Sequence, residues 1–216
     1  PDGKHLSLFG DAGELSMRER LSPPQRQVRF SGAIHSLAFT HGSRLLVGGS
    51  FGLQAVDIGS LQTRSLADLQ VESLRLSPDG SRVFLRDAQN RSLVVDAADG
   101  RVVYAPTDPW AAADFSRDGK EVWGASQSSD FLVRVDLDKG GSQAVRDGLT
   151  SPTTLVRLGG ESLVAAAYTN LDNGLVGLWK VGQRVGEFQL AHQRVACLEF
   201  NDDRSRIVAG GSGGEV

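Results

Sequence analysis

The segment Leu74–Phe84 reads LRLSPDGSRVF, two apolar stretches separated by a polar turn. Proline fixes its own φ, aspartate bonds to nearby backbone, and glycine accepts a positive φ, so Pro78-Asp79-Gly80 is a strong turn former. The short stretches on either side, which alternate apolar and polar residues, are typical of strands. The segment therefore predicts a β-hairpin whose turn lies at residues 77–80.

The same pattern recurs along the chain with a period of about forty residues. Its copies are Leu37–Leu46, Leu74–Phe84, Ala113–Trp123, a weaker Val156–Val164, and Leu198–Val208. A second marker closes a later strand and is followed within four residues by glycine; its copies are Val56-Asp57, Val95-Asp96, Val135-Asp136 and Trp179-Lys180. Two markers that keep one period indicate a true internal repeat.

Four short strands in about 40 residues are typical of a β-propeller blade. No window sustains the apolar period of a helix. We therefore predict an all-β fold, a β-propeller of four-stranded antiparallel blades, which forms one domain over residues 1–216. The complete blades are expected at 31–69, 70–107, 108–149 and 150–192, with partial blades at 1–30 and 193–216. We expect a segment of a longer propeller, although a ring closed by the two partial blades is the alternative.

Several of these segments resemble the WD40 and WD40-like propeller superfamily. Ser77–Gly80 matches its first hairpin turn, Leu178-Trp179-Lys180 resembles its closing Trp-Asp, and Ala191-His192 resembles its Gly-His opening. Ile207–Val216 resembles its second strand and the start of its third. The resemblance implies a structural hydrogen-bond network in which His192 pairs with Ser212. The other closing pairs read Val-Asp, which leaves WD40 proper and a related propeller repeat both open.

Charge and cysteine content limit the classes of partner. The net charge is −3 and Cys197 is the single cysteine. A slightly negative net charge does not favour binding to nucleic acid. A single cysteine cannot form a disulfide framework. No apolar run approaches the ~20 residues of a membrane span. We expect a cytoplasmic protein, with the periplasm as the alternative, that uses no cofactor or metal, binds protein partners, and is monomeric if the ring closes.

Two residues are candidate contacts on the face formed by the loops that enter the innermost strands. Trp110 follows the loop 106–109 and is the best candidate for an exposed aromatic contact, although a core tryptophan between blades is the alternative. His35 lies at the start of an earlier innermost strand. A non-enzymatic scaffold or sensor region of a larger protein is the function that these observations favour.

The alternative is a propeller enzyme of the lactonase or hydrolase type, with a ligand or metal site at the central channel. The middle of the innermost strands carries Ala38, Arg75, Asp114, Arg157 and Glu199. Glu199, Asp114 and His35 are the candidate ligands. The Gly-x-Ser-x-Gly stretch 210–214 lacks the following helix that a nucleophile elbow needs. The glycine-rich stretch 48–52 predicts a hairpin turn. The acidic stretch 136–141 also predicts a turn, rather than a calcium site. We expect Cys197 to be a buried thiol.

Overall fold

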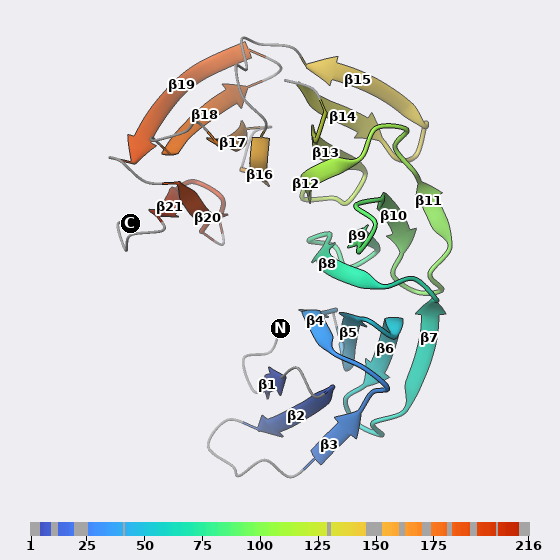
Figure 1. The fold of residues 1–216 in the computed structure, drawn as a ribbon. Coiled ribbons are helices and arrows are strands. Elements are labelled where there is room, and N and C mark those ends of the chain that lie inside the picture. Colours follow the sequence, from blue (N-terminus) through green and yellow to red (C-terminus); the bar gives the residue numbers. More distant parts are fainter. Residues whose placement is uncertain are drawn as a thin grey trace. The chain divides into compact units, whose positions relative to one another are not determined.

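The computed structural model describes residues 5–9, 13–19, 26–40, 42–128, 131–145, 153–159, 163–169, 174–180, 183–190, 194–201 and 203–211. The chain divides into two compact units, residues 1–105 and 106–216. Both units consist of antiparallel sheets in which each strand pairs with the next one along the chain (Figure 1).

Unit 1 contains a three-stranded sheet followed by two four-stranded sheets. The strands of the first are β1 (His5–Phe9), β2 (Glu14–Glu19) and β3 (Arg26–Arg29). Those of the second are β4 (Ile34–Phe39), β5 (Arg44–Gly49), β6 (Gly52–Asp57) and β7 (Thr63–Ala67). Those of the third are β8 (Val71–Leu76), β9 (Arg82–Asp87), β10 (Ser92–Asp96) and β11 (Val102–Tyr104).

Unit 2 contains two four-stranded sheets and, among its described residues, a final pair of strands. The first sheet is formed by β12 (Trp110–Phe115), β13 (Glu121–Ser126), β14 (Leu132–Asp136) and β15 (Gly141–Val145). The second is formed by β16 (Thr153–Leu158), β17 (Leu163–Thr169), β18 (Gly174–Lys180) and β19 (Gln183–Leu190). The last pair is β20 (Val195–Phe200) and β21 (Ile207–Gly211). The predicted all-β fold with four-stranded antiparallel blades is confirmed.

The turn between the first two strands of a sheet is built by side chains within it. Ser77 Oγ donates to Asp79 Oδ1 at 2.6 Å and accepts the N–H of Arg82 at 2.9 Å. Gly80 has a φ of 75°, and its N–H donates to the carbonyl of Ser77. Ser116, Asp118, Gly119 and Glu121 repeat this arrangement before β13. The Ser-x-Asp-Gly pattern thus supplies these two hairpins with their own hydrogen bonds.

The Val-Asp marker has two separate structural roles. Its apolar residue is fully buried, as in Val56, Val95 and Val135, and Trp179 takes this place in β18. Its aspartate accepts a backbone N–H from the turn that follows, at 2.7 Å for Asp57, 2.8 Å for Asp96 and 3.0 Å for Asp136. The marker therefore combines a core residue with a turn cap, which explains why both residue types recur together.

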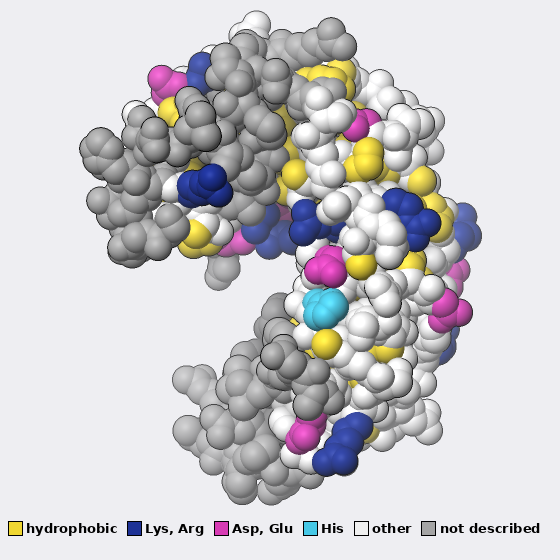
Figure 2. All heavy atoms as spheres, in the orientation of Figure 1, with side chains coloured by type: hydrophobic (Ala, Val, Ile, Leu, Met, Phe, Trp, Pro, Cys, Tyr) yellow, Lys and Arg dark blue, Asp and Glu magenta, His cyan; other side chains and the backbone are white. Residues whose placement is uncertain are grey.

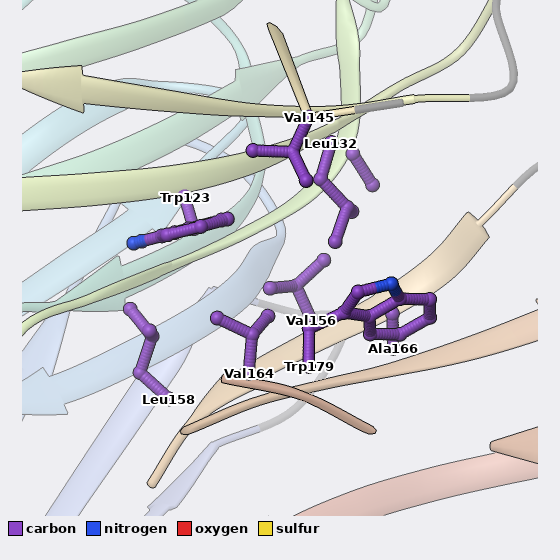
Figure 3. Packing of buried hydrophobic residues seen from close by; sticks show 9 residues of the cluster. Trp123, Leu132, Val145, Val156, Leu158, Val164, Ala166 and Trp179 are labelled. Carbon is purple, nitrogen blue, oxygen red and sulfur yellow. The ribbon is translucent and has the colours of Figure 1, made fainter. Parts of the chain in front are cut away.

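Within each unit, adjacent sheets pack face to face, and successive residues of a second strand can enter different cores. Leu45 and Val47 pack with Leu15 and Val28 of the first sheet, together with Ile34 and Val56. Leu46, between them, packs with the third sheet in a cluster that includes Val71 and Leu85. In unit 2, Trp123, Leu132 and Val145 pack against Val156, Val164 and Trp179 (Figure 3). Both faces of these sheets are buried, which explains the continuous apolar runs in the second strands.

Asp118→Asn is expected to lower stability at neutral pH and to lose this effect in acid. The Ser116 hydroxyl and the N–H of Lys120 stabilise the carboxylate and lower the pKa of Asp118. Stability from such a group is present above the unfolded pKa of about 3.9 and is lost as the pH falls through the lower folded value. Urea unfolding midpoints measured from pH 7 to pH 2 should therefore converge for the two proteins below about pH 4. Asp138→Asn, an exposed change on the turn after β14, is the matched control. A difference that persists unchanged at pH 2 would contradict this account.

Candidate interaction face

The first strand of each sheet from β4 onward begins with a β-bulge. The register shifts occur between the first and third residues of the strand, at Ile34/Ser36, Val71/Ser73, Trp110/Ala112, Thr153/Leu155 and Val195/Cys197. The skipped residues are His35, Glu72, Ala111, Thr154 and Ala196. Bulges re-aim side chains, and they often lie next to functional sites. A bulge at the start of the first strand is therefore a feature shared by these sheets, in addition to the register shifts between third and fourth strands at Leu53/Gln54, Val94/Val95 and Leu178/Trp179.

His35 has an exposed side chain that is fixed in place by the neighbouring sheet. Its Nδ1 lies 2.9 Å from the carbonyl oxygen of Val71, the first residue of β8. The adjacent residue, Ser36, accepts the N–H of Leu74 on its hydroxyl at 3.3 Å. Two successive side chains of β4 thus bind the backbone of β8 and join the two sheets at this end.

Glu72 is the bulge residue of β8 and directly follows the Val71 that binds His35. Its side chain is exposed, and among the residues that the structure describes it has no ion-pair or hydrogen-bond partner. We call His35 and Glu72 the bulge pair. Figure 2 shows a histidine on the face turned to the viewer with an acidic side chain next to it in this view. Glu72 is not among the residues predicted from the sequence, although Ile34-His35 and Val71-Glu72 share the signal of a polar residue after the apolar start of a strand.

Trp110, predicted as an exposed contact, is buried, and that prediction is wrong. Its side chain is 1% exposed and lies over Gly124, where an added Cβ would come within 2.0 Å of the indole. Asp108 accepts hydrogen bonds from the hydroxyls of Ser126 and Ser128 and thereby fixes the segment before β12. The tryptophan is held in the core because the glycine opposite leaves room for its ring.

The prediction that Cys197 is a buried thiol is also wrong, because its side chain is exposed. Strict alternation from the buried Val195 would point Cys197 inward. The bulge at Ala196 resets the alternation, so the next buried residue is Leu198.

The charged residues expected at the channel bind other parts of the protein. Asp114 is 1% exposed, and its Oδ2 accepts the N–H of Leu158 at 2.9 Å. Arg157 forms an ion pair with Glu199 at 3.1 Å. His35 belongs to unit 1, whereas Asp114 and Glu199 belong to unit 2. The structure does not bring the three together within one unit, and the enzymatic alternative stays a prediction.

The remaining predictions concern residues outside the described ranges and possible metal sites. His192 and Ser212, with the rest of the stretch 212–214, are not among the described residues. Within the described ranges, no group of three or more His, Cys, Asp or Glu residues could hold a metal ion. No helix in those ranges is long and apolar enough to cross a membrane.

A polar groove of about 720 Å³ lies in unit 1, at the end of the sheets opposite the bulge pair. Arg44, Asp57, Asp79 and Asp96 are among its lining residues. Hydrogen bonds from Ser60 lower the pKa of Asp57. Burial raises the pKa of Asp79, but hydrogen bonds from Ser77 and Ser81 outweigh this and lower it overall. These carboxylates already accept the hydrogen bonds of their turns, so the groove is explained by turn structure.

Comparison with known proteins supports the fold alone. No protein-family model matches the sequence, and no curated protein is similar to it at a significant level. Among solved structures, the chain is similar to the hydrazine synthase of Kuenenia stuttgartiensis, with a TM-score of 0.68 and 15% sequence identity. The match covers 82% of this chain and 55% of that chain, so the protein spans about half of that length. Together with the four-stranded antiparallel sheets, this likeness shows the architecture of β-propeller blades.

Proposed function

We propose that this chain is a WD40-like β-propeller region that mediates protein–protein interaction, as a scaffold or sensor part of a larger protein and without catalysis of its own. The observation that carries the proposal is the bulge pair. The bulges turn His35 and Glu72 outward from strands whose first residues are buried. Rigid sheets that present exposed polar side chains at their ends are suited to recognition.

The His35 ring and the backbone that carries Glu72 are held by groups that are separate from the exposed atoms. Val71 is fully buried and packs over Gly48, where an added Cβ would lie 2.6 Å from Val71 Cγ1. The His35 and Ser36 bonds then fix β4 against β8. A partner would therefore meet a fixed imidazole on a rigid backbone, which improves affinity for a given contact area because little conformational freedom of these parts is lost on binding.

Selection from a display library of random 16-residue peptides tests this function. The full chain is the target, and the double variant His35→Ala, Glu72→Ala is the counter-target. Asp99→Asn removes a charge from the turn after β10, at the other end of the sheet, and is the matched control. We expect selected peptides to bind the wild type and Asp99→Asn equally and to bind the double variant at least about tenfold more weakly, a loss of 1.4 kcal/mol.

Two results would contradict the proposal. Selected peptides that bind the double variant as tightly as the wild type would place recognition away from the bulge pair. A selection that yields no peptide above background would reject this end of unit 1 as a recognition surface. Circular dichroism of each variant establishes that the sheets are intact.

A further inference from the structure

We propose that the bulge pair binds a cationic side chain, an arginine or lysine presented by a partner protein. The inference rests on the proposed function and specifies the chemistry of the partner at the same site. It follows from three features of unit 1: the hydrogen-bonding state of His35, the free carboxylate of Glu72, and the rigid backbone that joins them.

The contact with Val71 determines which nitrogen of His35 faces outward as an acceptor. A carbonyl oxygen can only accept a hydrogen bond, so the Nδ1 of His35, 2.9 Å away, must carry the proton. In a neutral imidazole the other nitrogen then has the lone pair. Because the side chain is exposed, Nε2 is available as a hydrogen-bond acceptor for a molecule in solution.

Glu72 adds a negative charge on the residue that directly follows the carbonyl bound by His35. The carbonyl that binds His35 belongs to Val71, and its carbon is bonded to the nitrogen of Glu72. The imidazole therefore lies against the peptide unit from which the Glu72 side chain emerges. No hydrogen bond or ion pair with a described residue occupies that carboxylate.

The pair offers acceptors on its exposed side, so its complement is a group that only donates. Lysine and arginine side chains have donors and no acceptors, whereas phosphates and carboxylates bring further acceptors and negative charge. Arginine is the better fit of the two, because its planar fork can donate to two acceptors at once. A bound metal ion is disfavoured, since two side chains fall short of the usual four-ligand set of zinc sites in proteins.

The first experiment examines His35 directly by nuclear magnetic resonance. The full chain is labelled with ¹⁵N-histidine, and His35→Phe identifies the His35 signals. We expect the Nδ1-protonated tautomer and a shift of the Nε2 signal when the pentapeptide acetyl-Gly-Ser-Arg-Ser-Gly-amide is added. The same peptide with citrulline, which has the shape of arginine without its charge, should cause a much smaller shift. A protonated Nε2 with a bare Nδ1, or equal shifts with both peptides, would overturn the inference.

The second experiment measures the contribution of the carboxylate. Glu72→Gln keeps the shape of the side chain, and because that side chain bonds to no other described residue this change should leave the sheet intact. It should weaken arginine-peptide binding about tenfold, as expected for loss of one charge-assisted hydrogen bond. Asp99→Asn should leave binding unchanged. Equal binding by Glu72→Gln and the wild type would exclude Glu72 from the site.

These results are separable from those of the peptide selection. Selected peptides that depend on the bulge pair but keep their affinity when every basic residue is replaced by citrulline or norleucine would overturn the cation inference and leave the interaction function standing. Selected peptides that bind the double variant as tightly as the wild type would overturn the interaction function at this face. The pentapeptide titration then decides by itself whether the pair has any preference for cations.

Discussion

Trp179→Ala is expected to lower the free energy of unfolding by about 3–5 kcal/mol, the largest loss among the changes described. The indole is 1% exposed and belongs to a cluster that joins two sheets, where Leu132 and Val145 come from one sheet and Val156 and Val164 from the other (Figure 3). Removal of the ring leaves a cavity that these side chains can close only in part. Urea unfolding followed by circular dichroism measures the loss.

The matched control for this change is Val185→Ala on the neighbouring strand β19. Val185 is 57% exposed, so its truncation should change stability by no more than about 0.5 kcal/mol. A loss for Trp179→Ala that is as small as this would show that the cluster of Figure 3 contributes little to the stability of unit 2.

Gly124→Ala is expected to cost at least about 2 kcal/mol through overpacking. The added methyl carbon would lie 2.0 Å from Cδ2 of Trp110, an indole that is buried and has little space to move. The double variant Gly124→Ala, Trp110→Leu should regain part of the stability relative to the sum of the two single changes, because leucine vacates the space above residue 124.

Gly141→Ala provides the control for the glycine substitution itself. Gly141 begins β15 in the same unit, and an added Cβ there would meet no atom within 4 Å. Thermal unfolding should therefore give nearly the same midpoint as the wild type. Equal effects of Gly124→Ala and Gly141→Ala would mean that backbone entropy, rather than contact with Trp110, determines the role of Gly124.

The repeat predicted the turns well because their chemistry is local. Ser77, Asp79 and Gly80 interact within a few residues of one another, so their order in the sequence contains nearly all of the information. The strand alternation was less informative at the bulges. One extra residue at position 196 changes the side of the sheet on which Cys197 lies, and no local feature of the sequence predicts where the register slips.

The site residues show the same limit. Trp110 follows a proline-rich loop, which favours exposure, yet its environment is determined by Gly124 across the hairpin. A glycine within an otherwise apolar strand can indicate close approach by another group, and this signal was present in the sequence. Whether the Glu72 carboxylate has a hydrogen-bond or ion-pair partner depends on which described side chains the fold brings near it. Only the three-dimensional structure can show this.

The order of strand pairing has a consequence for biosynthesis. Among the described strands, every hydrogen-bonded pair joins neighbours along the chain, and each four-stranded sheet is completed within about forty residues. Such short sequence separations allow a sheet to form soon after its last strand leaves the ribosome, and domains fold as units during synthesis. Within each unit, a finished sheet then offers an apolar face on which the next one can pack, so each unit is suited to vectorial, co-translational assembly.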